Sequence, residues 1–463
     1  MIGDELKYHV LQSFQLKPTP EQTEAVQRFA TFMDTRHSRV VMILRGSAGT
    51  GKTTLAAAIV RGMMALKQKL VLLAPTGRAA KVFSLYAHCP AYTIHRHIYR
   101  EKSLAGGFEL NFNKHRDTLF IVDEASMISN QPQREAAFGS GCLLDDLMAF
   151  VYGHDANCRL LLIGDSAQLP PIGETDSPAL AASTLRAYGM TVYEADLNEV
   201  LRQSQQSGIL SNANLIRNTL FPTLPKVRLG FPDVRVVPGD ELIETLANSY
   251  RQVGQDATIV ITRSNKRANI YNQGIRNTVL DRDEQLGRGD RLMIVKNNYF
   301  WRNNDFIANG DMAVVQRVRH VHEMHGFRFA DITMTFPDYD DYELTATTLL
   351  DTLTAEAPAL TRQQQDQLFN NVLHDYADIT QKTERMKKLK EDRYYNALQV
   401  KFAYAVTCHK AQGGQWQHVY IDQGYITDDM INPDYLHWLY TAFTRATEKL
   451  FLVNWPQSQI RSL

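Results

Sequence analysis

Short apolar runs, bounded by polar or glycine-rich segments, recur through the first half of the chain. They are Val40–Leu44, Leu70–Ala74, Leu119–Val122 and Leu160–Ile163. Runs of this length and composition are typical of strands that are buried on both faces. Helical segments such as Thr53–Ala65 lie between them. This alternation predicts an α/β fold with a parallel sheet.

A second α/β pattern follows a proline-rich stretch at Phe221–Gly239, which we interpret as the boundary between two large domains. The predicted domains are residues 1–235 and 236–463. The elements expected in the second domain are a strand at Ala257–Thr262, a helix at Asn265–Leu280, a strand near Lys401, a helix at Leu436–Leu450 and a strand at Phe451–Asn454.

The second domain is interrupted at about residues 285–400. Shorter β runs at Arg291–Val295, Met312–Val318 and Phe327–Phe336 are separated by Asn-Gly and His-Gly turns, which predicts a small inserted β-barrel. The polar segment Asp338–Arg393, first acidic and then basic, is interpreted as a helical excursion from that barrel.

Composition excludes several classes of protein. Among 463 residues, 50 Lys and Arg balance 50 Asp and Glu, so bulk positive charge cannot drive nucleic-acid binding, although a local basic groove can. Cys89, Cys142, Cys158 and Cys408 form no C-x-x-C pair, as expected for free thiols in a reducing cytoplasm. No apolar run is long enough to cross a bilayer, so we expect a cytoplasmic protein without membrane contact.

A phosphate-binding P-loop is the clearest motif. Gly46-Ser-Ala-Gly-Thr-Gly51-Lys52-Thr53 follows a predicted strand and opens a predicted helix. In that setting the backbone N–H groups of the turn cradle phosphates, Lys52 reaches the β and γ phosphates, and the Thr53 hydroxyl holds Mg²⁺.

Two further strand ends carry polar residues suited to nucleotide hydrolysis. Asp123 and Glu124 follow the run Leu119–Val122; in an NTPase the first acid orients Mg²⁺, and the second accepts the proton of the attacking water. After the next strand comes Gly164-Asp-Ser-Ala-Gln168-Leu-Pro-Pro171, where Gln168 can sense the γ-phosphate or position water.

The order of these motifs resembles that of superfamily 1 helicases. The further matching segments are Ala74-Pro-Thr-Gly-Arg-Ala-Ala-Lys81, Thr93-Ile-His95, Leu201-Arg202-Gln203, Asn309-Gly-Asp311, Thr407-Cys-His-Lys-Ala-Gln-Gly413 and Tyr440-Thr-Ala-Phe-Thr-Arg445-Ala. The resemblance covers about residues 18–455 and is most like the RecD and Dda branch. It implies two RecA-like domains that bind ATP and Mg²⁺ in their shared cleft and move along single-stranded DNA from 5′ to 3′.

The resemblance implies roles for residues that carry little signal alone. Arg202 and Arg445 look like the arginines that reach the γ-phosphate, which suits a guanidinium fork. Gln22 is the expected adenine contact. Gln415 stands where relatives often carry Glu; it can hydrogen-bond a ribose hydroxyl but carries no charge. The whole expected nucleotide set is Gln22, Gly46, Ser47, Ala48, Gly49, Thr50, Gly51, Lys52, Thr53, Thr54 and Gln415.

The expected DNA-facing residues lie near strand ends on the matching motifs. Their hydroxyl, imidazole, guanidinium and ammonium groups suit contacts to phosphate and sugar that carry no sequence information. They are Thr76, Arg78, Thr93, His95, Thr407, His409 and Lys410.

A hairpin is expected at about residues 97–118, because Gly106-Gly107 precedes an apolar/polar alternation and glycines tolerate the positive φ angles of a tight turn. Its place matches that of the pin which meets the duplex junction in RecD and Dda helicases. Phe108 is the residue expected to wedge a base pair. The alternative is a surface hairpin whose Phe108 packs on its own domain.

We therefore expect a monomeric DNA helicase that acts on single-stranded DNA and tailed duplexes, and that replication or repair proteins recruit. Two alternatives stay open. One is an ATP-gated single-strand-binding motor subunit of a repair or conjugation complex that does not unwind by itself. The other is a small-molecule P-loop kinase, which leaves the motifs of the second domain unexplained.

Overall fold

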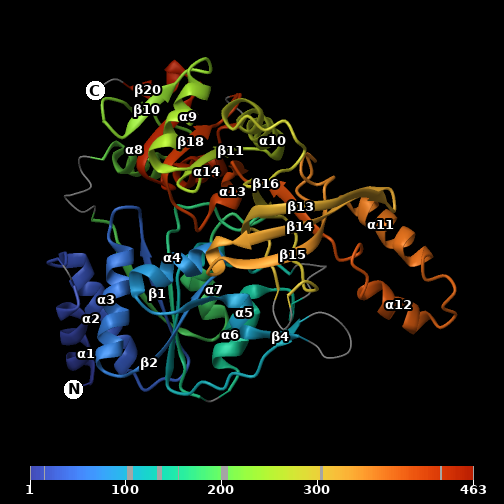
Figure 1. Ribbon diagram of the computed structural model, residues 1–463. Coiled ribbons are helices and arrows are strands. Elements are labelled where there is room, and N and C mark those ends of the chain that lie inside the picture. Colours follow the sequence, from blue (N-terminus) through green and yellow to red (C-terminus); the bar gives the residue numbers. More distant parts are fainter. Residues whose placement is uncertain are drawn as a thin grey trace.

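The computed structural model describes residues 2–14, 16–101, 108–132, 138–154, 156–199, 207–302, 306–427 and 430–461. Two parallel sheets lie one above the other in Figure 1, with a barrel beside them and two helices projecting from the barrel. The predicted α/β architecture, with two parallel sheets and an inserted barrel, is confirmed.

The first sheet is parallel throughout and contains the predicted strands in the order β3-β2-β6-β7-β1-β8. Its strands are β1 (Val40–Gly46), β2 (Lys69–Ala74), β3 (Ala91–Thr93), β6 (Thr118–Val122), β7 (Arg159–Gly164) and β8 (Thr191–Leu197). Its helices are α1 (Ile2–Gln12), α2 (Pro20–Asp34), α3 (Lys52–Ala65), α4 (Gly77–Ala87), α5 (Ile94–Ile98), α6 (Leu143–Tyr152) and α7 (Ala182–Ala187), with 3-10 turns at Ala125–Met127 and Pro178–Leu180.

Alternate residues of each strand pack into separate cores on the two faces of this sheet. In β1, Met42 and Leu44 join the core that α1 to α4 cover, whereas Val41 and Ile43 face α5 and α6. The apolar runs are unbroken because successive side chains of a strand point to opposite faces and both faces are covered.

The second sheet is also parallel, in the order β10-β19-β18-β11-β17. Its strands are β10 (Val234–Val237), β11 (Thr258–Thr262), β17 (Ala405–Thr407), β18 (Trp416–Asp422) and β19 (Ala446–Val453). Around it lie α8 (Gly208–Arg217), α9 (Leu242–Val253), α10 (Asn265–Gly274), a π turn (Ile275–Val279), α13 (Cys408–Ala411), α14 (Pro433–Phe443) and the strand pair β9 (Val227–Arg228) and β20 (Ile460–Arg461).

Two boundaries differ from the prediction. The expected division between residues 235 and 236 falls inside β10, which pairs with β19 of the second sheet, and α8 already packs on α14; the chain therefore enters the second unit earlier. The helix expected at Leu436–Leu450 ends at Phe443, and β19 begins at Ala446. The apolar residues Leu450 and Leu452 belong to the strand and fill the core beside α14.

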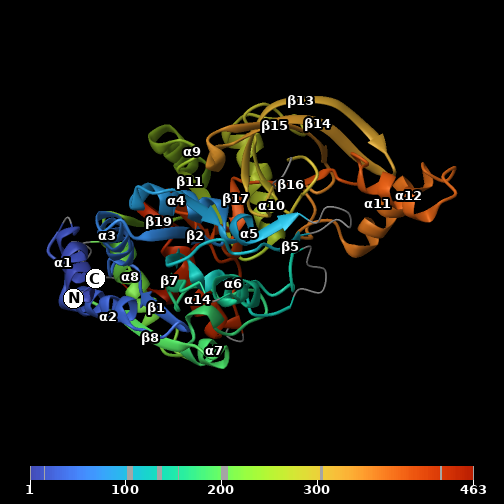
Figure 2. The same cartoon turned by 90° about the horizontal axis from the view of Figure 1, so that it is seen from below.

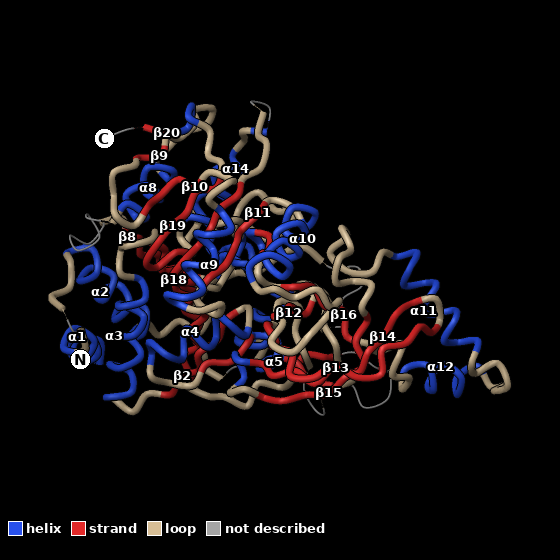
Figure 3. The backbone as a smooth tube through the Cα atoms, turned by 45° about the horizontal axis from the view of Figure 1, so that its top comes forward, coloured by secondary structure: helices blue, strands red, loops and turns tan. Residues whose placement is uncertain are grey.

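The insertion is a closed barrel of β12 (Arg291–Ile294), β13 (Met312–Met324), β14 (Phe327–Phe336), β15 (Tyr342–Leu349) and β16 (Leu398–Phe402). The segment expected to be helical begins instead with a 3-10 turn and β15, and then forms α11 (Arg362–His374) and α12 (Lys382–Lys390). The threonines of β15 hide its periodicity in the sequence, because Thr345 is exposed whereas Thr347 and Thr348 are buried. Figure 3 shows the two helices beyond the ends of the barrel strands.

The four cysteines are free, as expected for thiols outside a disulfide framework. None of the described helices is both long and apolar enough to span a bilayer. Within the described ranges, no group of His, Cys, Asp and Glu side chains is arranged to hold a metal ion, and this includes the histidines at the end of β13.

A buried ion cluster fixes the barrel to the second sheet. Asp290 is fully buried, and its two carboxylate oxygens each lie 3.0 Å from a guanidinium nitrogen of Arg276. Arg282, the Gly287 N–H and the Tyr404 hydroxyl also donate to it, at 2.7, 2.8 and 2.9 Å. Burial alone raises the pKa of a carboxyl group, but these donors hold the pKa of Asp290 below its ordinary value.

Replacing Asp290 by Asn removes the anion and leaves the buried Arg276 without a counter-ion. We expect Asp290→Asn to lower the free energy of unfolding by about 3–5 kcal/mol at neutral pH. Because the pKa of Asp290 is lower in the folded state, its contribution is complete above about pH 4 and is lost as the pH falls through the folded pKa. Urea unfolding at neutral and acidic pH measures this; the exposed Asp283→Asn is the control, and an equal loss in both variants contradicts the cluster's role.

Candidate functional site

The P-loop joins the end of β1 to the start of α3. Gly49 and Gly51 have φ angles of 79° and 80°, in the left-handed region that glycine adopts without steric cost. Lys52 Nζ donates to the Gly46 carbonyl at 2.5 Å and lies 3.7 Å from Asp165 Oδ2. The loop therefore presents the sharp turn and helix N-terminus that bind phosphate.

Gln22 lies against this loop, although its sequence signal was weak. Its side chain is 2% exposed, and Nε2 donates to the Thr50 carbonyl at 3.2 Å. Its Oε1 accepts from the Thr19 N–H at 3.0 Å and completes a capping box at the start of α2. The structure thus places Gln22 beside the P-loop; its adenine contact stays a prediction.

The carboxylates Asp123 and Glu124 follow β6, as predicted. The Glu124 N–H donates to Asp123 Oδ1 at 2.9 Å, and the Tyr86 hydroxyl donates to the other oxygen of Asp123. Burial raises the pKa of both carboxyl groups, while the positive charge of Lys52 acts in the opposite direction on each. A divalent cation favours the charged forms in the same way, so the Asp123 carboxylate and the exposed Thr53 hydroxyl are oxygen donors that fit Mg²⁺.

The loop at residues 165–169 is bound by α14 of the second sheet. The Leu169 N–H donates to Thr441 Oγ1 at 2.7 Å, and His437 Nδ1 lies 2.9 Å from the Ala167 carbonyl. From the neighbouring segment, Gln412 Nε2 donates to the Leu169 carbonyl at 2.7 Å. The loop that carries Gln168 is thus held by the opposite domain.

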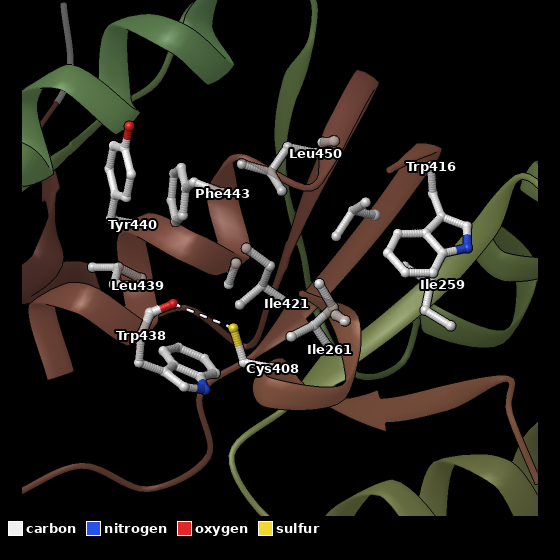
Figure 4. Packing of buried hydrophobic residues seen from close by; sticks show 14 of the residues in the cluster. Ile259, Ile261, Cys408, Trp416, Ile421, Trp438, Leu439, Tyr440, Phe443 and Leu450 are labelled. Carbon is white, nitrogen blue, oxygen red and sulfur yellow. Dashed lines mark hydrogen bonds between the residues drawn. The ribbon is translucent and has the colours of Figure 1, made fainter. Parts of the chain in front are cut away.

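Tyr440 connects α14 to the P-loop directly. Its hydroxyl accepts from the Ala48 N–H at 2.8 Å and donates to Asp165 Oδ2 at 2.6 Å. Its ring belongs to the core of the second domain, and Figure 4 shows it near Phe443 with the hydroxyl pointing away from the packed side chains. One side chain therefore joins the core of one domain to the phosphate-binding loop of the other.

Gln168 and Arg445 lie in the same interface. Gln168 is 5% exposed, and its Oε1 is a buried oxygen without a hydrogen-bond partner in the part of the chain that the structure describes. Arg445 is 2% exposed; its Nε donates to the Thr441 carbonyl at 3.1 Å, and its charge lowers the pKa of Glu124 against the effect of burial. Arg202 lies outside the described residues.

Two residues at the site were missed by the sequence analysis. Arg217, at the end of α8, donates to Ser47 Oγ at 2.5 Å and to Asn198 Oδ1 at 2.7 Å. Tyr440 stood within a matching motif but had no assigned role. The sequence did not indicate a role for either residue. A single Arg or Tyr on a helix is common, and its contacts depend on how the two domains meet.

The expected DNA-facing residues lie along the junction between the first sheet and the barrel-bearing domain. A cavity of about 510 Å³ is lined by Thr76 and His95 from one side and by Lys296, Asn297 and Asn309 from the other. A smaller cavity of about 140 Å³ continues this lining with Arg78, His409 and Lys410. Burial lowers the pKa of Lys410 to about 8. The two cavities bring these residues together. Thr93 does not line either cavity and is buried, with 4% of its surface exposed.

Several of these side chains form hydrogen bonds or stacking contacts within the protein. The hydroxyls of Thr76 and Thr93 cap α4 and α5, whereas the Thr407 hydroxyl does not cap α13. Arg78 stacks over Trp416 at 4.2 Å and donates to the Gln415 carbonyl at 3.0 Å. Arg78 therefore binds across the two domains, and its partner is the backbone carbonyl of Gln415.

The two strands of the expected hairpin are present, but the side chain of Phe108 is not exposed as predicted. Its strands β4 (Tyr99–Glu101) and β5 (Phe108–Leu110) pair antiparallel, while residues 102–107 lie outside the described ranges. Phe108 is 7% exposed, with its ring centroid 4.9 Å from Phe138 and 4.8 Å from Tyr299. The expectation of an exposed wedge at Phe108 is therefore wrong, because Phe138 of its own domain and Tyr299 of the connection between β12 and β13 bury it.

Comparison with known proteins agrees with this arrangement. The AAA domain profile matches residues 17–220, and the UvrD-like helicase C-terminal domain profile matches residues 402–453. An ATP-dependent RecD2 DNA helicase of Deinococcus radiodurans is 24% identical over 433 residues, covering 91% of this chain and 48% of the relative. The chain thus spans about half the length of that relative.

Two other similarities extend over nearly the whole chain. An uncharacterised protein of Acanthamoeba polyphaga mimivirus is 22% identical over 492 residues, covering 90% of this chain and 95% of that protein. A solved structure described as showing DNA unwinding at forked duplex DNA by two coordinating Pif1 helicases has a TM-score of 0.50 at 16% identity, covering 96% of this chain and 94% of the other. At this identity the likeness concerns the fold.

The P-loop beneath a second parallel sheet, with α14 reaching into the phosphate site, defines a P-loop NTPase whose site lies between two domains. The order of its motifs resembles that of superfamily 1 helicases. Its profile matches are to an AAA domain and a UvrD-like helicase C-terminal domain, and the chain is similar in sequence to a RecD2 helicase and in fold to Pif1 helicases.

The Tyr440 hydroxyl can be removed without removing its ring. We expect Tyr440→Phe to reduce DNA-stimulated ATP turnover about tenfold or more, because a hydrogen bond to a charged group is worth about 1.5–3 kcal/mol. The control is Tyr435→Phe on the same helix, whose hydroxyl donates to Gln423 at 2.7 Å within its own domain. Steady-state ATP hydrolysis measures both, and equal turnover in the two variants contradicts the link.

Proposed function

We propose that this chain is an ATP-driven DNA helicase that moves 5′ to 3′ on single-stranded DNA and separates duplex strands. The observation that carries the proposal is that the second domain holds the phosphate-binding loop of the first. The Tyr440 hydroxyl of α14 accepts from the Ala48 N–H at 2.8 Å and donates to Asp165 Oδ2 at 2.6 Å. A site that needs both domains makes hydrolysis depend on their relative position, which is how a motor couples ATP to movement.

The roles of the site residues follow from their positions. Lys52 and the N–H groups of the P-loop bind the phosphates, and Gln168 positions the attacking water. Glu124 accepts the proton of that water, and burial raises its pKa above that of an exposed carboxylate, which makes it a stronger base. Arg445, with Arg202, stabilises the charge that develops on the transferred phosphoryl group. Mg²⁺, held by Thr53 and Asp123, would neutralise charge on the β and γ phosphates.

The DNA strand is proposed to follow the residues that line the two cavities between the domains. The same domains contribute to the nucleotide site, so closing the cleft changes the grip on the strand. Hydroxyls, imidazoles and Lys410 contact backbone phosphates and sugars, which makes the grip tolerant of sequence. The substrates are single-stranded DNA and tailed duplexes, bound by a monomer that replication or repair proteins recruit.

The β4–β5 hairpin remains the proposed element that meets the duplex junction. Since Phe108 is buried, its proposed role is to hold the hairpin against the inserted barrel. Its ring contacts Tyr299 and Phe306 of the connection between β12 and β13, at centroid distances of 4.8 and 5.9 Å. The hairpin base is thereby supported by both domains.

Two variants separate ATP binding from hydrolysis. Lys52→Ala should lose both, because the phosphates lose their cation, whereas Glu124→Gln should bind ATP and hydrolyse it at least about a hundredfold more slowly. Nucleotide binding by fluorescence, and hydrolysis with and without single-stranded DNA, give the two readouts.

The matched control is Asp117→Asn, a surface carboxylate just before β6, at the opposite end from Glu124. It should hydrolyse ATP like the parent. If Glu124→Gln also hydrolyses ATP like the parent, Glu124 is not the general base. If single-stranded DNA does not stimulate ATP hydrolysis by the parent, the result argues against a DNA motor.

A further inference from the structure

The helices α11 and α12 extend from the barrel away from both sheets. In Figures 1 and 2 they project on the side of the molecule toward which β4 and β5 lie. The nucleotide site and the cavities described above use none of their residues. We refer to α11, α12 and their connections, residues 360–397, as the arm.

The arm is a fixed structure with its own core. Leu368, Val372 and Leu389 pack against Phe327 and Phe329 of the barrel strand β14. Asn371 Nδ2 donates to the His325 carbonyl at 2.9 Å, and this bond ties α11 to the turn between β13 and β14. The orientation of the arm is therefore set by the barrel.

The outer helix of the arm is positively charged, although the chain as a whole is neutral. In α12, five basic residues accompany one acidic residue, Glu384. Of the acids near α12, Asp392 is half-buried and accepts from the Tyr376 hydroxyl at 2.8 Å, whereas Asp375 is exposed and lies 3.4 Å from His325.

The lysines of α12 point outward. Lys382, Lys387 and Lys388 are exposed, and the side chains of these three make no ion pair or hydrogen bond within the described ranges. Asp375, Asp378, Glu384 and Glu391 are exposed as well and reduce the charge of the arm, but within α12 itself five basic residues outnumber one acid. Flexible ammonium groups on a rigid support suit phosphate, which they contact as point charges without reading sequence.

We infer that the arm binds the phosphate backbone of double-stranded DNA ahead of the strand junction. This inference rests on the proposed function. Phe108 of the hairpin packs on Tyr299 in the connection between the barrel strands β12 and β13, and the arm is built on the same barrel. The inserted barrel thus carries the arm and also contacts the hairpin, and arm and hairpin strands lie toward the same side of the molecule in Figures 1 and 2.

The test compares the parent with Lys382→Ala/Lys387→Ala/Lys388→Ala. Fluorescence anisotropy measures the affinity for a 5′-tailed duplex and for the tail alone at several salt concentrations. The triple variant should bind the tailed duplex about tenfold more weakly, and the slope of log K against log salt should fall by about one to three, since each lost phosphate contact removes about 0.9. Binding of the tail alone and DNA-stimulated hydrolysis should not change.

A control with the same loss of charge is Lys17→Ala/Lys226→Ala/Lys449→Ala, which replaces exposed lysines elsewhere on the protein. It should bind both DNAs like the parent. Hydroxyl-radical footprinting should also show that the parent, but not the arm variant, protects the first base pairs beyond the junction.

Three outcomes decide the matter. Loss confined to the tailed duplex supports the inference, whereas equal binding by arm variant and parent overturns it. An equal loss for tail and duplex also overturns it, because the lysines then act on the single strand. A parent without DNA-stimulated ATP hydrolysis contradicts the proposed function, which is a separate failure.

Discussion

The contact between the 165–169 loop and α14 is the constraint on which the rest of the arrangement depends. It places Tyr440, Thr441 and His437 against a loop that ends a strand of the other domain. Buried hydrogen bonds of this kind require close positioning, because each unpaired partner costs about 1–3 kcal/mol. The two sheets consequently meet in one defined orientation, with the Tyr440 hydroxyl against the Ala48 N–H of the P-loop.

This interface explains why the nucleotide and DNA candidates are neighbours. The strand ends that carry Asp123, Gln168 and Thr76 all lie on the carboxyl edge of the first parallel sheet, where loops converge. Arg78 crosses the same interface to stack on Trp416. A change in the distance between the domains therefore alters the contacts at the phosphate site and the proposed DNA contacts together.

Much of the fold and of the nucleotide site could be predicted from the sequence. Buried parallel strands appear as unbroken apolar runs, and the P-loop combines glycines and lysine at fixed spacing, so β1 and Lys52 lie where expected. Elements that lack a continuous apolar run could not be assigned in this way. The strand β15 is rich in threonine, and the apolar residues of β19 follow those of α14 without a clear break.

Residues whose environment comes from distant parts of the chain could not be predicted. Phe108 looked like an exposed wedge, but its burial depends on Tyr299 and Phe306, nearly two hundred residues later. Tyr440 and Arg217 likewise acquire their partners only when the domains meet.

The central claim is that ATP hydrolysis between the two domains drives strand separation in one direction. The most direct measurement follows separation of duplexes with a 5′ tail, a 3′ tail or no tail, in ATP and in a non-hydrolysable analogue. The account predicts separation of the 5′-tailed duplex alone, and only with ATP. Equal separation of the 3′-tailed duplex, or separation in the analogue, would contradict it.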